Sequence, residues 1–283
     1  MTERKLQNAE QIAEKLVRDE GLTLPINVLA LAASREIHVE AKPASAKGVS
    51  GMLIRAGESY AIAYATHITS EGFQRFSIAH ELGHYFLPGH PDAVFRSGNT
   101  HESRGGFGSG DQIELEADHF AAGLLMPKHL FKAAAGRYPD GLEAIKGITE
   151  DCKTSLTASA IRYARLTDAA IAIVLSTGSS VDYCFVSNSM RQAKGYRHLK
   201  KGSLLPQHTA TRTFNQVPEN ISLAKDASDD TDLNLWFHTD EEITASEEIV
   251  GLGEYGKTLT VITADLPDDE DDSDGEWKAP RFK

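Results

Sequence analysis

The feature of the sequence that most constrains the fold is an apolar stretch, residues Glu71–Phe86, that contains two histidines and ends just before Pro88-Gly89. Its apolar residues recur at helical spacing, and a Pro-Gly pair is a normal helix stop, so the stretch predicts one helix. His80 and His84 are four residues apart and therefore share one face of that helix. The surrounding apolar residues predict that the helix packs into a core: Phe76, Ile78, Ala79, Leu82 and Phe86.

The sequence from His80 to His84, H-E-x-x-H, has the spacing of a metal site. Two neutral imidazole nitrogens one helical turn apart reach a single Zn²⁺ at about 2.0–2.1 Å. Glu81 lies beside them, at the position of the general base of a metallopeptidase, where it acts on the water of the ion rather than on the ion itself. The alternative is a pair of ordinary surface histidines. The apolar neighbours disfavour it, and so does Gly83, which leaves room for another backbone.

A catalytic zinc requires a third protein ligand, and His90 is one candidate. It lies six residues after His84, where a metzincin motif would place its last histidine. That motif needs a glycine three residues after the second histidine, and here that position is Leu87. The metzincin interpretation therefore fails where the chain would have to turn.

The other candidates lie on a second predicted helix, Gln112–Met126, which Asp111 caps and Pro127 ends. Glu114 and Asp118 are four residues apart on one face, so Glu114 could bind the metal while Asp118 accepts the N–H of a liganding histidine. Glu116 points away from that pair. The sequence thus favours Glu114, with Glu116 second and His90 third.

Peptide hydrolysis also needs a group that stabilises the oxyanion, and a surface that takes the substrate. His101, in the Gly- and Ser-rich segment Arg96–Gly110, and Tyr85 are both candidates, and the residues do not decide between them. The segment itself is expected to be a loop that buries little. The predicted strand Ser59–Tyr64 is a candidate edge for an added substrate strand, although an ordinary core hairpin explains it equally well.

Composition excludes several other classes of protein. Of the −12 net charge of the 283 residues, eight acidic groups lie in Asp265–Glu276, and without them the net charge is only −4. A broad basic face for nucleic acid is therefore not expected. Two cysteines, Cys152 and Cys184, exclude a disulfide-dense scaffold and a four-cysteine zinc site. No apolar run is long enough to span a membrane, and the polar N-terminus lacks a signal peptide, so a cytoplasmic protein is expected.

Two sequence runs together resemble the ImmA/IrrE family of metallo-endopeptidases. They are RFSIAHELGHYF at Arg75–Phe86 and IELEADHFAAGLLMP at Ile113–Pro127, and the resemblance extends in order over residues 5–190. It implies a zincin-like fold of the gluzincin kind, in which Glu114 is the third metal ligand. It also implies a regulatory role, in which a helix-turn-helix repressor is cleaved to derepress stress-response or mobile-element genes.

The expected fold class is α+β. Residues 1–130 are predicted to form a zinc metallopeptidase core, mostly helical with a small hairpin or sheet. Residues 131–167 form a helical segment whose part Gly147–Leu166 resembles a helix-turn-helix, although it carries too few basic residues to predict DNA contact. A smaller α/β module at 168–264 and a disordered acidic tail at 265–283 complete the predicted organisation.

These observations favour a zinc-dependent endopeptidase with Glu81 as its general base. The expected metal ligands are His80, His84 and Glu114, and Asp118 is expected to accept a hydrogen bond from one of the liganding histidines. Manganese is the alternative metal. The expected partner is a protein substrate, a helix-turn-helix repressor, with neither DNA nor a membrane contacted directly. The competing hypothesis is a metal-containing module that sequesters or senses a repressor without turnover. The intact Glu81 argues against it, because a module that only binds needs no base.

Overall fold

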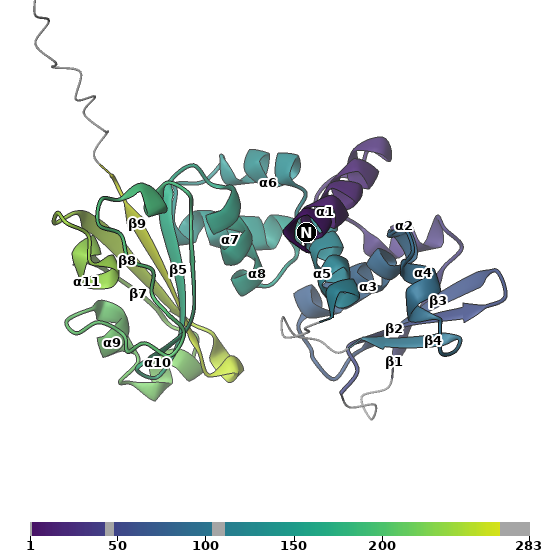
Figure 1. The fold of residues 1–283 in the computed structure, drawn as a ribbon. Helices are drawn as coiled ribbons and strands as arrows, with labels where there is room; N and C mark the ends of the chain where they lie inside the picture. The colour runs from purple at the N-terminus through teal and green to yellow at the C-terminus, as the bar shows by residue number, and fades with distance from the viewer. Residues whose placement is uncertain (1, 43–47, 104–110, 267–283) are drawn as a thin grey trace, which may run out of the picture. The chain divides into compact units, whose positions relative to one another are not determined.

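The computed structural model describes residues 2–42, 48–103 and 111–266. They form two compact units that divide between Leu166 and Thr167 (Figure 1). Each unit combines helices with its own sheet, which confirms the α+β class. The predicted acidic tail lies outside the described residues from residue 267 onwards. Among the described helices, none combines the length and apolar character needed to cross a membrane.

The sheet of the first unit has four strands in the order β1-β3-β2-β4. β2 and β3 form the predicted antiparallel hairpin, and β1 joins β3 in parallel. The interpretation of Ser59–Tyr64 as an edge strand is wrong, because β3 is hydrogen-bonded on both sides. One edge is instead β4, which lies within the segment expected to be a loop. The strands are β1 (His38–Lys42), β2 (Gly51–Ala56), β3 (Ser59–Ala65) and β4 (Thr100–Ser103).

α3 (Glu71–Phe86) packs on this sheet, and α5 (Gln112–Leu125) packs on α3. α3 begins at Ser70, whose side chain accepts a hydrogen bond from the N–H of Phe73, and it packs on β2 and β3. α5 begins at the predicted cap Asp111 and packs between α3 and α1 (Thr2–Asp19). The other helices of the unit are α2 (Val28–Ala33), α4 (His90–Val94), α6 (Lys128–Ala135), α7 (Leu142–Cys152) and α8 (Leu156–Leu166).

The second unit is built on a five-stranded antiparallel sheet in the order β6-β5-β9-β8-β7. Trp236 and Phe237, both fully buried, lie in the core on one side of it. The strands are β5 (Ala170–Thr177), β6 (Ser180–Val186), β7 (Asp226–Asp232), β8 (Thr244–Gly251) and β9 (Thr258–Ala264). The helices are α9 (Ala210–Phe214), α10 (Pro218–Ser222) and α11 (Leu233–Phe237), with short 3₁₀ turns at Met190–Gln192 and Gly253–Tyr255.

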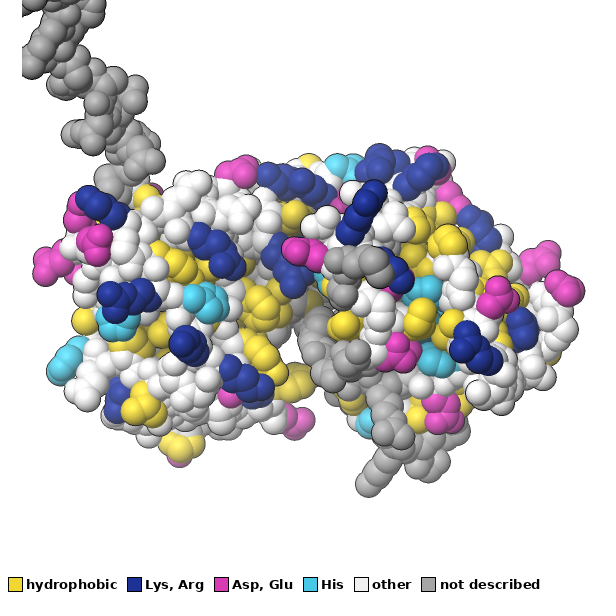
Figure 2. Space-filling model, in the orientation of Figure 1, with side chains coloured by type: hydrophobic (Ala, Val, Ile, Leu, Met, Phe, Trp, Pro, Cys, Tyr) yellow, Lys and Arg dark blue, Asp and Glu magenta, His cyan; other side chains and the backbone are white. Residues whose placement is uncertain are grey.

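The surface carries charges of both signs. On the face shown in Figure 2, Lys and Arg side chains are interspersed with uncharged, apolar and acidic ones. This mixture agrees with the near-neutral balance of the chain outside its acidic tail.

Candidate metal centre

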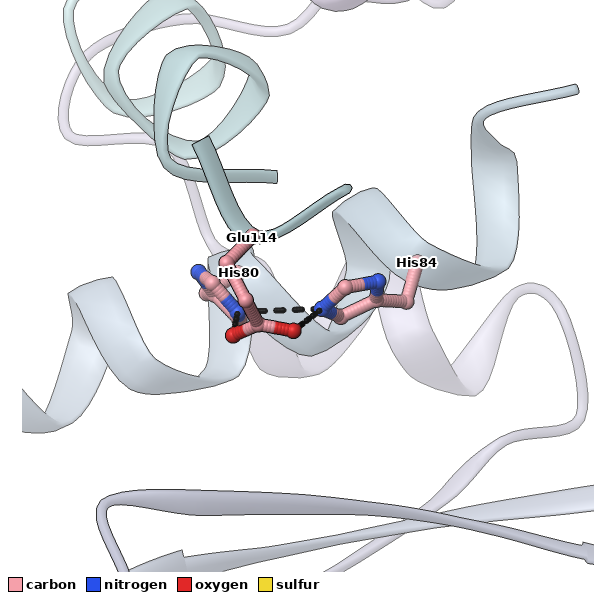
Figure 3. Close-up of side chains that lie close together, drawn as sticks. All are labelled: His80, His84 and Glu114. Carbon is pink, nitrogen blue, oxygen red and sulfur yellow. Dashed lines mark hydrogen bonds and ion pairs between the residues drawn. The ribbon is translucent and has the colours of Figure 1, made fainter. Parts of the chain in front are cut away.

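α3 brings the two histidines to one place. His80 is 6% exposed and His84 is fully buried, and their Nε2 atoms are 3.0 Å apart. Both imidazoles point away from the helix toward the same point, as Figure 3 shows. The apolar residues of α3 bury the helix, and the i, i+4 spacing aligns the two rings.

α5 adds a carboxylate to this pair. Glu114 Oε2 lies 3.3 Å from His80 Nε2, and Glu114 Oε1 lies 3.3 Å from His84 Nε2. In Figure 3 the carboxylate faces both rings. Among the described residues, His80, His84 and Glu114 are the group whose ligand atoms, all within 4.8 Å of one another, could hold a metal ion.

A close contact between the two helices makes this geometry accessible. A Cβ at Gly83 would lie 3.2 Å from Ala117 Cα and 3.2 Å from its carbonyl oxygen. Glycine at this position therefore lets α5 approach α3 closely enough for Glu114 to reach the histidines.

The donor set fits a divalent zinc ion. Two imidazole nitrogens and one carboxylate are a ligand set of catalytic zinc sites, which leave the fourth position open. Nδ1 of His80 lies 2.9 Å from Asp118 Oδ1, so this contact occupies the outer nitrogen and leaves Nε2 for a metal. The structure thus brings together four of the predicted residues: His80, His84, Glu114 and Asp118.

Charge and burial set the protonation of these side chains. Burial lowers the pKa of His84 to about 3, which keeps this imidazole neutral. Burial would also lower the pKa of His80, but its hydrogen bonds to Asp118 and Glu114 outweigh burial and raise that pKa to about 10. Burial would raise the pKa of Glu114, whereas hydrogen bonds from the surrounding histidines hold it well below its usual range. An ionised carboxylate and a neutral imidazole are the forms that bind a metal, so Glu114 and His84 are ready to bind one, whereas His80 must first release its proton from Nε2.

Glu81 lies next to the pair without a partner of its own. It is fully buried, and neither carboxylate oxygen makes a hydrogen bond within the described residues. Burial raises the pKa of Glu81 to about 7, although the nearby charge of His80 opposes the shift. A buried carboxyl group whose pKa lies near neutrality is suited to general-base catalysis.

The two alternative ligand candidates lie elsewhere. His90 is 2% exposed, and its Nδ1 lies 3.2 Å from Nδ1 of His84, on the outer side of that ring. Its Nε2 lies 3.3 Å from Glu116 Oε2. His90 and Glu116 therefore contact one another rather than joining the three-residue group.

The two candidates for oxyanion stabilisation separate in the structure. β4 places His101 Nε2 3.0 Å from Glu114 Oε1, with its ring centroid 4.5 Å from that of His84. Tyr85 packs instead edge-on against Tyr60, with ring centroids 5.0 Å apart. Of the two candidates, the described contacts therefore place His101 at the metal group.

Comparison with known proteins adds a family. Residues 32–163 match the family Peptidase_M78, described as the IrrE N-terminal-like domain, and this range includes α3 and α5. The chain is also similar in fold to a solved structure, a Mycobacterium tuberculosis transcriptional regulator. The TM-score is 0.56 and the identity 14%, over 92% of this chain and 88% of that chain. No curated protein matches the chain.

Proposed function

Because the chain belongs, through residues 32–163, to the Peptidase_M78 (IrrE N-terminal-like) family, we propose that it is a zinc-dependent endopeptidase. The resemblance found in the two sequence motifs is thereby confirmed, and the family suggests metallopeptidase activity and implies a metal cofactor. The observation that carries the proposal is the convergence of His80, His84 and Glu114 beside the unpaired carboxylate of Glu81.

In this proposal each residue has a separate task. His80 and His84 bind the zinc ion through Nε2, Glu114 binds it through its carboxylate, and Asp118 accepts the Nδ1–H of His80. A zinc ion held there would supply a Lewis acid that polarises the scissile carbonyl and lowers the pKa of a water to about 7. The Glu81 carboxylate takes a proton from the attacking water and passes it to the nitrogen of the leaving amine.

The finer organisation of the chain belongs to the same proposal. Residues 1–130 would form the zincin-like core, with β2 and β3 beneath α3. Residues 131–167, containing α7 and α8, would be the segment that resembles a helix-turn-helix, and 168–264 the separate α/β module. α6 packs on α7 and α7 on α8, within the same compact unit as the core.

The proposed substrate is a protein, a helix-turn-helix transcriptional repressor whose cleavage derepresses stress-response or mobile-element genes. The family resemblance is the basis for this choice. The name of the structural neighbour, a transcriptional regulator, is compatible with it. The mixed charge of the surface gives no reason to add DNA as a direct partner.

The decisive experiment incubates the zinc-loaded protein with a repressor encoded beside its gene and follows cleavage by mass spectrometry. We expect cleavage by the wild type and none by Glu81→Gln, with the zinc content of both equal by elemental analysis. Cleavage that persists in Glu81→Gln would refute the mechanism. Tight binding of the repressor without cleavage would favour the module without turnover. The same analysis, on protein purified from its host, distinguishes zinc from manganese.

A further inference from the structure

We propose that His90 is a positioning residue for His84, and that Glu116 in turn holds His90. This inference rests on the proposed metal site. It assigns a role to His90 and Glu116, which the sequence alone suggested only as alternatives to Glu114 as the third metal ligand.

The contacts form a continuous chain of hydrogen bonds behind His84. Nδ1 of His84 lies 3.2 Å from Nδ1 of His90, and Nε2 of His90 lies 3.3 Å from Glu116 Oε2. The other oxygen of Glu116, Oε1, accepts a hydrogen bond from Nε2 of Gln112 at 2.9 Å. This series of hydrogen bonds thus starts on α3, passes through α4 and ends on the first turn of α5.

Which ring nitrogen carries a proton in His84 and His90 follows from the nitrogen of His84 that faces His80 and Glu114. His84 Nε2 points at His80 and Glu114, so a neutral His84 carries its proton on Nδ1 and donates it to His90 Nδ1. His90 then carries its own proton on Nε2 and donates it to the Glu116 carboxylate. Each ring therefore has one tautomer that satisfies all of its contacts, and that tautomer leaves Nε2 of His84 with a lone pair for the metal.

The turn between α3 and α4 is built to deliver His90 to this position. α3 ends at Phe86, and Gly89 has a φ of +80°, a left-handed conformation that favours glycine. The chain reverses there, and His90 becomes the first residue of α4 while remaining 2% exposed. The Pro88-Gly89 pair, which by sequence only stops a helix, therefore also returns a second imidazole to the back of His84.

His80 and His84 are held in different ways. His80 donates directly to the Asp118 carboxylate, whereas His84 reaches its carboxylate, Glu116, only through His90. Partners behind liganding histidines typically contribute 10–100-fold to metal affinity, because they fix both the tautomer and the ring orientation. His90 is expected to have an effect of this size without touching the metal.

The test is a zinc titration of the metal-free full-length protein in competition with a chelator of known affinity. We expect His90→Leu, which removes the acceptor, to weaken zinc binding about 10–100-fold. His90→Asn places an oxygen near the position of Nδ1 and should recover most of that affinity. His129→Leu is the matched control, because His129 is an exposed histidine on α6, and its zinc affinity should equal that of the wild type.

Two further measurements keep the proposal falsifiable if His90→Leu does not fold. Nitrogen-15 NMR of the histidine rings should show His84 protonated at Nδ1 and His90 at Nε2 in the zinc-loaded wild type. Glu116→Leu should lower zinc affinity by a smaller factor than His90→Leu. Wild-type zinc affinity in His90→Leu, or a proton on Nε2 of His84, would overturn the inference. If the wild-type protein bound no zinc, the proposed function itself would be refuted. Zinc affinity and ring protonation test the role of His90 without any measurement of repressor cleavage.

Discussion

At the scale of single residues, the carboxylate of Glu81, the proposed general base, fits only because the neighbouring strand has a glycine beside it. A Cβ at Gly51 in β2 would lie 2.4 Å from Glu81 Oε1, far closer than two such atoms approach. Glu81 is fully buried and has no hydrogen-bond partner to hold it within the described residues. Its position is therefore determined by packing, and Gly51 supplies the space.

We therefore expect Gly51→Ala to displace Glu81 and to lower the rate of peptide hydrolysis about 100-fold, since a misplacement of about 1 Å has effects of that size. Zinc content should remain that of the wild type, because the three atoms nearest to the added Cβ all belong to Glu81 and not to a candidate ligand. A cleavage assay paired with elemental analysis tests this. Gly98→Ala is the control, since a Cβ there meets nothing within 4 Å. Equal rates for the two variants would contradict the expectation.

The sequence was sufficient to predict which side chains converge between α3 and α5, but not what surrounds them. The i, i+4 spacing predicts that His80 and His84 share one helix face and that Glu114 and Asp118 share another. The structure brings these four side chains together. The contact between His84 and His90 depends on how the chain reverses at Gly89, which no periodicity encodes. A histidine directly after a Pro-Gly pair was the only signal available for it.

At the scale of elements, the metal group depends on the distance between α3 and α5. The closest contact is at Gly83, where any larger side chain would meet the backbone of Ala117. We expect Gly83→Val to push α5 outward and to lower the free energy of unfolding by about 1–3 kcal/mol. Urea denaturation measures this change. Gly136→Val, at an exposed glycine with a single neighbour at 3.6 Å, should change stability by less than about 0.5 kcal/mol.

A buried ion pair connects α1 to α8. The guanidinium of Arg162, 4% exposed, contacts the carboxylate of Glu10, lies 3.3 Å from Glu14 and donates to the carbonyl of Met126. Burial would raise the pKa of Glu10, but a hydrogen bond from His119 and the charge of Arg162 outweigh it and lower the pKa to about 2. Glu10 therefore stabilises the fold more when it is ionised.

This depressed pKa predicts a specific loss of stability in acid. The contribution of Glu10 is fully present above its ordinary pKa of 4.5 and disappears as the pH falls toward about 2. At neutral pH it amounts to about 2–3 kcal/mol. In chemical denaturation at a series of pH values, Glu10→Gln should be less stable than the wild type at pH 7, and the difference should shrink below pH 4.5. A difference that stays constant from pH 7 to pH 2 would contradict this assignment.

Elements with strong periodicity were predictable, and those fixed by tertiary contacts were not. The predicted limits of α3 agree with the structure, whereas β4 was missed because its Gly- and Ser-rich neighbours suggested a loop. The run Leu233–Phe237 is apolar enough for a buried strand. Asp232 accepts a hydrogen bond from the N–H of Asn234 and starts helix α11 instead. β7, with the sequence DASDDTD, has only Thr231 among the residues typical of strands and is held by its pairing with β8.

At the scale of the whole molecule, the residues of the proposed active site all lie in one of two compact units. All three candidate ligands and Glu81 lie before Leu166, whereas the second unit has its own core around Trp236. A ligand that binds only the folded first unit should stabilise that unit by mass action. Zinc therefore distinguishes the two units in a single experiment on the full chain.

Calorimetry of the metal-free protein, with and without zinc, makes this prediction measurable. At a free zinc concentration about 1,000 times the dissociation constant, binding contributes about 4 kcal/mol, and for a unit of this size that corresponds to a rise in Tm of about 10 °C. The rise should occur in the transition of residues 1–166 and leave that of the second unit unchanged. In His84→Ala, which lacks one ligand, zinc at the same concentration should produce little or no rise. An equal rise in His84→Ala would mean that zinc stabilises the chain from somewhere other than the α3–α5 site, and the proposed peptidase would lose its physical basis.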